Sequence, residues 1–363
     1  MTNREREILE LIKKNPFITQ EEIASKLNIA RASVAVHITN LMKKGYILGK
    51  GYIINLDEYV LVIGGANVDI QGFPKEKLRY KDSNIGILNM SLGGVGRNIA
   101  ENLARLNVNV KLITAIGDDM YGRKILEHSK NIGIDMSHSL IVSDENTSTY
   151  LSILDEDGDM AVALSCMDIC DRIGVDFIKS KKKIIEGSRV CVVDTNIPKE
   201  TLEVIAELED VVLFLDTVST KKAQKVKDFI GKFHTIKPNR YEAEILTGIY
   251  VDNVDKAKKA CEVFLNKGVE RVFLSLGEDG VVCGDSQGIF KIDMPKVCVV
   301  NATGAGDAFL AGLVFSYIND YSMEASAKFA MAAAAIALSS KDTISNKMTI
   351  QNVNTKAKEM GLC

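Results

Sequence analysis

The chain has 363 residues, of which 46% are hydrophobic and 26% charged, a composition that predicts a folded protein of two or three domains. No apolar run approaches the ~20 residues that span a bilayer, and the charged start MTNREREILELIKKN does not resemble a signal peptide, so we expect a cytoplasmic protein with no membrane partner. The net charge of −3 is unevenly spread, because residues 1–56 carry nine Lys or Arg against five Glu. A basic first part on an acidic remainder predicts different partners for the two.

Residues 1–56 are predicted to form three helices followed by a hairpin. The first helix spans residues 4–14 and places its aliphatic side chains on one face. Thr19 and Glu22 form a capping box that begins the second helix. The third helix is followed by YILGKGYIINL (46–56), which alternates around GKG as a short hairpin does.

This arrangement resembles a winged helix-turn-helix domain, in which the third helix enters the major groove of DNA. The resemblance implies DNA as a partner of this part of the chain. Six outward side chains of the third helix are candidates for contacts with base edges or phosphates: Arg31, Ser33, His37, Asn40, Lys43 and Lys44. A three-helix domain that serves only packing or dimerisation is the alternative.

The rest of the chain, residues 60–363, alternates short β-rich runs with helical segments. Runs such as YVLVIGG, SRVCVVDTNI and VERVFLSLG end in Gly, Asn, Asp or Thr. Strands that alternate with helices predict an α/β fold with a mostly parallel sheet covered on both faces. Ligands of such folds bind beyond the carboxyl ends of the strands, so we expect the site among these polar residues.

Two segments depart from this alternation. Residues 147–165 contain a turn between two alternating arms, which predicts an antiparallel hairpin, and residues 69–92 lack a helix signal. Together they are expected to form a small β lid beside the main sheet.

The stretch NATGAGDAF (301–309) places three small residues and one acid at the start of a predicted helix. A helix N-terminus has unpaired N–H groups and a partial positive charge, so it binds anions. Gly304, Ala305 and Gly306 would let a phosphate approach the backbone, and Asp307 is placed to take the proton from an attacking hydroxyl. An anion hole beside a base predicts phosphoryl transfer; an ordinary strand-to-helix turn is the alternative.

Three further motifs precede that stretch: SLGGVGRNIAENLARL (91–106), KPNRYEAEIL (237–246) and SLGEDGVV (275–282). Together the four resemble the ribokinase-like (PfkB) family of carbohydrate and nucleoside kinases over about residues 60–350. The resemblance implies a three-layer α/β/α sandwich with a mostly parallel sheet and a small β lid, and a kinase that uses ATP and Mg²⁺. The sequence has no Walker motif GxxxxGK[ST], which argues against a P-loop kinase.

The resemblance also implies roles at matching positions. Asp307 would be the catalytic base, and the three small residues before it would hold the transferring phosphate. Asn239 and Glu242 of the N-x-x-E motif would organise Mg²⁺. Contacts with ATP would come from Asn239, Ser275, Gly277 and Gly280. Sugar hydroxyls would be bound by residues of the first half of this domain, Asn67, Asp69, Gly93, Gly94 and Asn98.

Within the family, DSNIG (82–86), ENTSTYLSILD (145–155) and NATGAGDA (301–308) are similar to the pseudouridine kinases. This likeness implies phosphorylation of the 5′-hydroxyl of pseudouridine. A uracil edge needs both donors and acceptors, which hydroxyl and amide side chains supply. The candidates for contacts with the base or ribose are Ser83, Asn84, Thr147, Ser148 and Thr149.

Three other expectations concern substrate and assembly. A kinase for another nucleoside or for a free sugar is the first alternative, and a sugar- or nucleoside-responsive transcriptional regulator on a kinase fold is the second. By analogy, the lid strands are candidates for pairing across a homodimer. Family members commonly have DTTGAGD where this chain has NATGAGD, and several bind a monovalent cation beside that first Asp. Asn301 removes the carboxylate, so we expect little dependence on potassium.

Overall fold

The computed structural model describes residues 1–49, 58–155, 157 and 159–362. Its largest element is a nine-stranded sheet made of β1 (Val60–Ile63), β4 (Val110–Ile113), β6 (Ile134–Asp135), β10 (Val190–Asp194), β11 (Leu213–Asp216), β12 (Thr235–Ile236), β13 (Arg271–Ser275), β14 (Val281–Asp285) and β15 (Gly288–Ile292). The order across the sheet is β15-β14-β13-β12-β11-β10-β1-β4-β6. The pairing is parallel from β6 to β13, and antiparallel between β13, β14 and β15.

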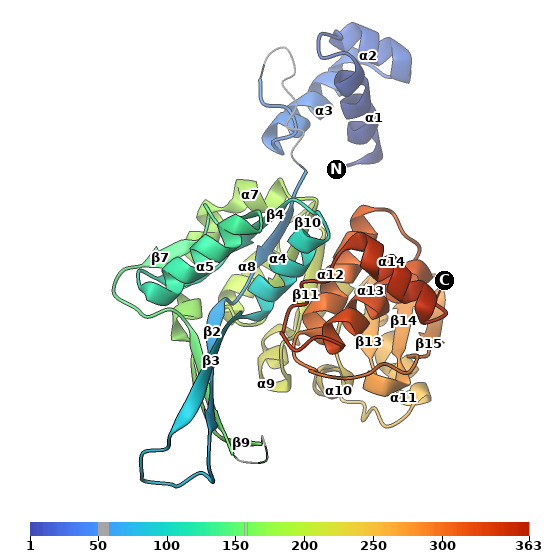
Figure 1. The fold of residues 1–363 in the computed structure, drawn as a ribbon. Helices are drawn as coiled ribbons and strands as arrows, with labels where there is room; N and C mark the ends of the chain where they lie inside the picture. The colour runs from blue at the N-terminus through green and yellow to red at the C-terminus, as the bar shows by residue number, and fades with distance from the viewer. Residues whose placement is uncertain (50–57, 156, 158, 363) are drawn as a thin grey trace.

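Helices cover both faces of this sheet and complete the predicted three-layer sandwich (Figure 1). One layer holds α4 (Val95–Arg105), α5 (Met120–Asn131), α12 (Ala305–Ile318), α13 (Met323–Leu338) and α14 (Ile350–Glu359). The other holds α6 (Val175–Ser180), α7 (Lys182–Glu186), α8 (Lys199–Ala206), α9 (Thr220–Ala223), α10 (Arg240–Thr247) and α11 (Val254–Asn266). Short 3₁₀ segments lie at Asp168–Arg172, Gln224–Val226, Ile230–Lys232 and Gly277–Asp279. Within the described ranges, no helix combines the length and apolarity needed to cross a membrane.

The central strands are apolar on both faces because both faces are covered. Every residue of β1 and of β10 is buried, which is typical of parallel strands between two helix layers. The two faces pack into two apolar clusters, one against each helix layer. Since parallel strands end at the same edge, the polar residues that follow β1, β10, β11 and β12 gather there.

Four strands outside the main sheet form the β lid: β2 (Asn67–Pro74), β3 (Gly86–Gly93), β8 (Thr149–Leu154) and β9 (Met160–Cys166). Their order is β3-β2-β8-β9, with β2 and β8 parallel and the outer pairs antiparallel. The lid projects from the body as a narrow sheet (Figure 1). A separate parallel pair is formed by β5 (Ala115–Gly117) and β7 (Leu140–Val142).

The first part of the chain, residues 1–49, is called the head here. Its helices α1 (Asn3–Lys14), α2 (Gln20–Leu27) and α3 (Arg31–Lys43) enclose a small aliphatic core. The capping box at the start of α2 is present, since Thr19 and Glu22 each accept the other's backbone N–H. Most of the predicted hairpin, residues 50–56, lies outside the described residues.

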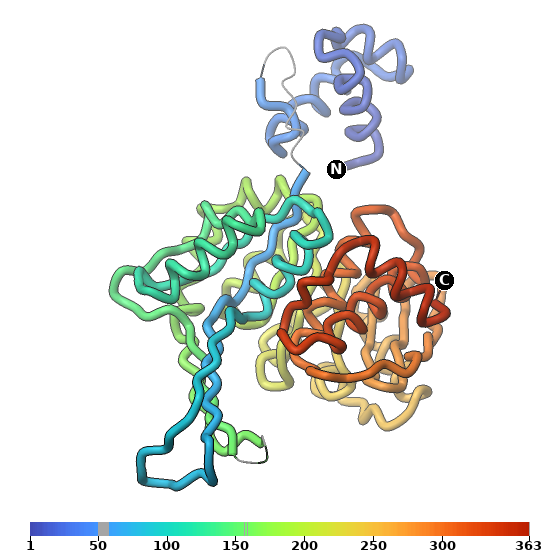
Figure 2. Tube along the Cα trace, in the orientation of Figure 1, coloured from blue at the N-terminus to red at the C-terminus, as the bar shows by residue number. Residues whose placement is uncertain are grey.

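The head and the lid lie at opposite ends of the molecule (Figure 2). The head contacts the body through Lys44, whose Nζ lies 3.3 Å from Oε2 of Glu5 and 2.9 Å from Oδ2 of Asp210. Asp210 precedes β11, so this contact is at the amino edge of the parallel strands, whereas the lid leaves from their carboxyl edge. The nine-stranded sheet therefore separates the head from the carboxyl edge of the parallel strands.

Candidate active site

The glycine-rich stretch forms the start of α12. Gly304 is its N-cap with a φ of 82°, and a Cβ there would lie 2.3 Å from the carbonyl oxygen of Thr343, so the position requires glycine. A Cβ at Gly306 would meet only one described atom within 4 Å, the Nζ of Lys237 at 3.2 Å. Because the first N–H groups of a helix have no intrahelical partner, this helix start offers an anion site with a cation beside it.

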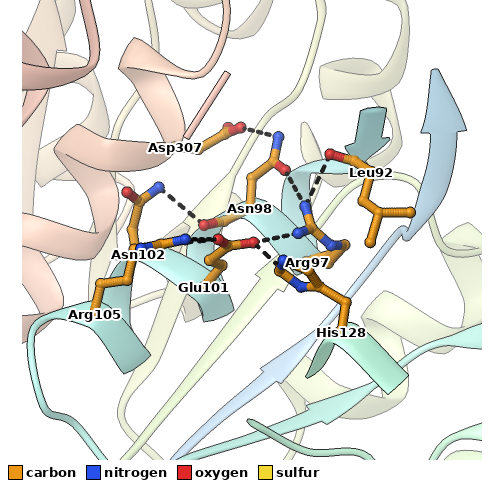
Figure 3. A network of polar contacts seen from close by, with 8 residues as sticks. All are labelled: Leu92, Arg97, Asn98, Glu101, Asn102, Arg105, His128 and Asp307. Carbon is orange, nitrogen blue, oxygen red and sulfur yellow. Dashed lines mark hydrogen bonds and ion pairs between the residues drawn. The ribbon is translucent and has the colours of Figure 1, made fainter. Parts of the chain in front are cut away.

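Asp307 lies in the first turn of α12 and is buried. Burial and the carboxylate of Asp216 raise the pKa of Asp307 to about 7, while a hydrogen bond from Asn98 and the charge of Lys237 oppose that rise. The hydrogen bond runs from Nδ2 of Asn98 to Oδ2 of Asp307 and measures 2.8 Å (Figure 3). A carboxylate with a pKa near neutrality is suited to accept a proton in a reaction.

Asn98 belongs to α4, whose start also depends on glycines. Gly94 is the N-cap with a φ of 97°, and a Cβ there would lie 2.5 Å from both the Cα of Ala66 and the carbonyl oxygen of Gly65. The absence of a side chain lets α4 approach the loop that follows β1. The starts of α4 and α12 are thereby joined through the Asn98–Asp307 hydrogen bond.

The predicted sugar-binding residues gather beside α4. Asn67 at the start of β2 pairs with Gly93 at the end of β3, and Nδ2 of Asn67 donates to Oδ1 of Asp69 over 2.5 Å. A Cβ at Gly93 would lie 2.2 Å from Oδ2 of Asp69. Burial raises the pKa of Asp69, whereas the Asn67 hydrogen bond and the charge of Arg97 lower it. A carboxylate in this setting can accept paired hydroxyl hydrogen bonds.

Asp194, at the end of β10, is fully buried but has a structural task. Its Oδ2 accepts the backbone N–H of Gly65 at 2.9 Å and of Gly96 at 2.8 Å. A Cβ at Gly64 would lie 2.2 Å from the same oxygen. Asp194 therefore ties the loop after β1 to the first turn of α4.

The predicted nucleotide-binding residues lie at the ends of β12 and β13. Asn239 forms an isolated parallel bridge with Ser275, so the two strand ends are adjacent. In the turn after β13, Gly277 and Gly280 have φ values of 68° and 94°, and a Cβ at Gly280 would lie 2.0 Å from the carbonyl oxygen of Ile292. The structure brings these four residues together. The contact at Gly280 leaves no room for a side chain there.

Glu242 lies one turn into α10, where its Oε2 accepts the backbone N–H of Asn239 at 2.9 Å and the hydroxyl of Thr217 at 2.7 Å. These are the hydrogen bonds that described residues make to this carboxylate, so Oε1 has no hydrogen bond from a described residue. Oδ2 of Asp216 is buried without a hydrogen bond that meets the geometric criteria, but it forms an ion pair with Nζ of Lys237 at 3.5 Å. A carboxylate oxygen without a hydrogen bond, such as Oε1 of Glu242, fits a hydrated Mg²⁺.

The ion would still need ligands from elsewhere. Among the residues that the structure describes, no three His, Cys, Asp or Glu side chains group closely enough to hold a metal. Mg²⁺ keeps several waters and is commonly held by one or two carboxylates plus substrate phosphates. The site is thus suited to an ion that arrives with a nucleotide.

Lys237 is a site residue that sequence reasoning missed. It follows β12 and is buried, with its Nζ 3.5 Å from Oδ2 of Asp216. The carboxylates of Asp216, Glu242 and Asp307 raise the pKa of Lys237 against the effect of its burial, so it stays charged. The available signal was the lysine between the end of the strand at Ile236 and the Asn of the N-x-x-E motif. Its ammonium group lies beside Gly306, where a transferring phosphate would sit.

The structure does not bring Ser83 and Asn84 to this site within one chain. Both are exposed in the loop between β2 and β3, at the tip of the lid. The eight residues of β2 separate that tip from Asn67, a distance of roughly 20 Å. Asn84 holds the loop together by bonding the backbone N–H and carbonyl of Arg79. Within one chain both residues therefore lie away from the sugar-binding cluster, and their contact with the base or ribose stays a prediction.

The contacts of three further candidates for the base or ribose, Thr147, Ser148 and Thr149, are with other parts of the protein. Thr147 is buried, and its hydroxyl donates to Oδ1 of Asp119, the N-cap of α5. Ser148 is buried against Cys170. Thr149 pairs with Val68, so it lies on the opposite face of the lid from Asn67 and Asp69. Their contacts are those of lid anchoring.

The candidate DNA-binding residues differ in their exposure to solvent. Arg31, Ser33 and Lys43 are exposed on α3, and His37 and Asn40 are half-buried. Lys44 is instead held between Glu5 of the head and Asp210 of the body. We therefore no longer place Lys44 among the phosphate contacts.

Comparison with known proteins decides the family. Residues 57–350 match the pfkB family of carbohydrate kinases. The chain belongs to this family. Residues 1–47 of this pfkB-family protein match a winged helix-turn-helix DNA-binding domain.

Two relatives come from Escherichia coli K12. The first, named uncharacterized sugar kinase YeiI, is 38% identical over 342 residues, which cover 94% of each chain. The second, pseudouridine kinase, is 40% identical over 298 residues, which cover 82% of this chain and 95% of that protein. The alignment with YeiI therefore extends into the head, beyond the region matched to the pfkB family.

Solved structures show the same fold. A Clostridium perfringens protein named as a sugar kinase is 41% identical, with a TM-score of 0.78 and coverage of 84% of this chain and 97% of that one. Arabidopsis thaliana ribokinase, solved with ribose and ATP, gives a TM-score of 0.75 at 20% identity, with coverage of 84% and 99%. The ribokinase fold of residues beyond the head is thereby established.

Proposed function

We propose that this pfkB-family protein is an ATP- and Mg²⁺-dependent kinase that phosphorylates the 5′-hydroxyl of pseudouridine. The observation that carries the proposal is the hydrogen bond between Asn98 and Asp307. This hydrogen bond joins the start of α4 to the start of α12. The sugar-binding cluster lies beside α4, and the start of α12 offers an anion site. Support for the nucleoside comes from the 40% identity to a pseudouridine kinase over 95% of that protein.

In the proposed reaction, Asp307 accepts the proton of the 5′-hydroxyl while that oxygen attacks the γ-phosphorus of ATP. The bond from the γ-phosphorus to the β–γ bridging oxygen breaks, and ADP leaves. The backbone of the α12 start and Lys237 hold the transferring group, and Asn67 and Asp69 orient the sugar. When bound with the nucleotide, Mg²⁺ neutralises phosphate charge. The lid strands β2 and β3 carry Asn67, Asp69 and Gly93, so a bound sugar lies against the lid and is shielded from water.

The substrate is tested by turnover of purified full-length protein with Mg-ATP against pseudouridine, uridine, cytidine, inosine, ribose and fructose. We expect kcat/KM to be highest for pseudouridine, by at least about tenfold, which corresponds to about 1.4 kcal/mol of differential transition-state stabilisation. Turnover of ribose or fructose with none of pseudouridine would favour the alternative substrate. That alternative stands because YeiI, 38% identical, is named only as a sugar kinase.

A regulator that uses the kinase fold only for sensing is the second alternative. A sensor does not need a buried base, an anion site and a partnered lysine in one place. The same screen separates the two, since a sensor would bind a nucleoside or sugar in calorimetry and form no ADP.

The head is proposed to bind DNA through α3, supported by the winged helix-turn-helix match over residues 1–47. Arg31, Ser33 and Lys43 are exposed on that helix. Affinity should fall steeply with salt, because bound phosphates release counterions. Lys43→Ala should weaken binding for all sequences, whereas Arg31→Ala should also change sequence preference.

The test is fluorescence anisotropy of the full chain with the DNA upstream of its own gene, from 50 to 200 mM salt. Lys328→Ala, at a half-buried lysine of α13 outside the head, is the matched control and should leave binding unchanged. Equal binding by wild type, Lys43→Ala and Arg31→Ala would argue that α3 does not contact DNA.

The lid is proposed to pair with the lid of a second copy. Register places Ile70, Met90, Leu151 and Leu164 on one face of the lid, opposite to the face of Asp69. Leu164 is 59% exposed and Met90 is 42% exposed, so much of this apolar face is uncovered within one chain. Sedimentation should give a dimer for the wild type and a monomer for Leu164→Glu. A wild-type monomer at 50 μM would exclude this pairing.

A further inference from the structure

We infer that Arg97 is a positioning residue: its guanidinium fixes the amide of Asn98 so that the amide nitrogen faces Asp307 (Figure 3). The effect on catalysis rests on the proposed kinase function, whereas the orientation of the amide is a property of the folded chain. Arg97 is buried behind Asn98 and acts through it.

The contacts of Arg97 define this role. Its Nη1 donates to Oδ1 of Asn98 over 3.1 Å and to the carbonyl oxygen of Leu92 over 3.0 Å. Its Nη2 donates to Oε2 of Glu101, one helical turn along α4. Arg97 and Glu101 are each only 2% exposed. The guanidinium thus spans the end of β3, the Asn98 amide and its own helix.

An amide side chain has nearly the same shape in two orientations that exchange its oxygen and nitrogen. A guanidinium has only donors, so it accepts only the orientation in which Oδ1 of Asn98 faces it. The flipped orientation would place the amide N–H groups against Arg97 and Oδ1 against the carboxylate of Asp307. Both contacts would then be repulsive, so Arg97 selects the orientation that donates to the base.

This selection matters because Asp307 lies among charges of both signs. The carboxylates of Asp216 and Asp194 face it from the ends of β11 and β10, and Lys237 faces it from the end of β12. Burial, followed by Asp216, raises the pKa of Asp307, and the hydrogen bond from Asn98 is the first of the effects that lower it. A donor to the ionised carboxylate favours the form that can accept a proton.

The same guanidinium also acts on the sugar side. Its charge lowers the pKa of Asp69, although burial and the Asn67 hydrogen bond are larger effects. Glu101 in turn holds Arg97 and accepts two hydrogen bonds from Arg105, at 2.9 and 2.7 Å, with His128 at 3.9 Å. Arg105 therefore shares the carboxylate of Glu101 with Arg97 but is not within hydrogen-bond reach of Asn98.

A purely structural role is the competing explanation, in which the ion pair only joins α4 to β3. A buried ion pair is often neutral for stability when both partners are replaced, and strongly destabilising when one is left. The double variant Arg97→Met/Glu101→Gln removes both charges and leaves the net charge unchanged. The Asn98→Ala background then separates an effect through the amide of Asn98 from a direct effect of the two charges on Asp307. Arg105→Gln is the matched control, since it removes the other partner of Glu101.

The decisive readout is the pKa of Asp307 in the full chain, measured by NMR with ¹³Cγ-labelled aspartate and assigned with Asp307→Asn. We expect the pKa to rise by about one unit in Arg97→Met/Glu101→Gln and by less than about 0.3 in Arg105→Gln. In an Asn98→Ala background the double change should have no further effect, because Arg97 acts through Asn98. If the Met variant does not fold, Arg97→Gln/Glu101→Gln serves, since a Gln amide accepts either orientation of its neighbour.

Two results would overturn the inference. A pKa shift below about 0.3 in the double variant would show that the amide holds its orientation without Arg97. A shift of equal size in the Asn98→Ala background would show that Arg97 acts on Asp307 directly. Neither result depends on turnover, so failure here is distinct from failure of the proposed kinase activity. Where the kinase is active, the acid limb of kcat/KM should move with the NMR value.

Discussion

Two glycine-rich helix starts, those of α4 and α12, meet at the Asn98–Asp307 hydrogen bond but use their glycines differently. At α4 the space is filled by the protein itself: Cβ atoms at Gly93 and Gly96 would lie 2.2 Å from Asp69 and 2.9 Å from the backbone of Gly64. At α12, the space beside Gly306 holds only the Nζ of Lys237. A glycine motif therefore predicts close approach, and its neighbours decide whether protein or ligand fills the space.

The two starts also differ in charge. The first turn of α4 contributes the neutral amide of Asn98, and the first turn of α12 contributes the acid of Asp307. In the proposed function, the amide start would serve the side of the sugar, and the acid start would serve proton and phosphate transfer. Variants that change one start at a time test this difference.

The largest effect is expected for Asp307→Asn, which keeps the shape of the side chain and removes the base. General-base catalysis typically contributes 10²–10⁴-fold, so kcat should fall at least about 100-fold while ATP affinity is kept. Steady-state kinetics and calorimetry on the same preparation measure both. A folded variant with a kcat within a few-fold of wild type would remove Asp307 from the mechanism.

The raised pKa of Asp307 also predicts how the stability of Asp307→Asn compares with that of wild type. The pKa of Asp307 is about 7 in the folded chain against an ordinary 3.8, so the stability that proton uptake contributes is lost as the pH rises from about 4 to 7. Asp307→Asn does not titrate. Its Tm should therefore be equal to or above that of wild type at pH 8, measured by calorimetry in matched buffers.

The next largest effect is expected for Lys237→Met, which removes the positive charge beside the α12 start. Loss of one preorganised charge beside the transferring group should lower kcat by roughly 10- to 100-fold. Asp216 would lose its charged partner, so Lys237→Met/Asp216→Asn is the control for stability. If the double variant recovers full kcat, Lys237 serves only to neutralise Asp216.

A matched pair of glycine variants tests whether protein or ligand fills the space at each helix start. Gly306→Ala should raise or keep the Tm, since Ala is the better helix former by about 1 kcal/mol, but should lower kcat by about tenfold by crowding Lys237. Gly96→Ala should instead reduce the free energy of unfolding by about 1–3 kcal/mol, because its Cβ meets the backbone of Gly64. Equal losses of stability in both variants would contradict the distinction.

The smallest effect concerns Asn301, upstream of the α12 start. Its Nδ2 donates to the carbonyl oxygen of Lys341 at 3.1 Å, and its Oδ1 accepts the N–H of Thr303 at 2.9 Å. With both amide atoms engaged and no carboxylate, activity should differ less than about threefold between sodium and potassium buffers, or ~0.65 kcal/mol. Asn301→Asp should increase that difference. A strong potassium dependence of the wild type would show that backbone oxygens suffice for a cation site.

Local sequence signals predicted much of this arrangement. The alternation of strands and helices indicated the layered α/β body, and NATGAGDAF indicated the start of α12 with its acid in the first turn. The capping box of Thr19 and Glu22 located α2 to the residue. These features depend on neighbours close in the chain, so the sequence expresses them directly.

Features that depend on distant segments were missed. Arg97 has the spacing of an ordinary exposed helix residue, and its burial depends on the carbonyl of Leu92 and on the lid strand that carries it. Ser83 and Asn84 belong to a motif whose loop lies at the far end of β2. The face of a strand on which a side chain lies depends on the pairing register. The β2–β8 register pairs Thr149 with Val68 and so places Thr149 on the lid face opposite to Asn67 and Asp69.

The most direct test of the account is the pH dependence of kcat/KM for wild-type protein with pseudouridine and saturating Mg-ATP. Because Asp307 must be ionised to accept the hydroxyl proton, the rate constant should rise through an apparent pKa of about 7 and level off above it. A rate constant that stays flat between about pH 5.5 and 8.5, in a protein that remains folded throughout, would contradict the assignment of Asp307 as a base of raised pKa.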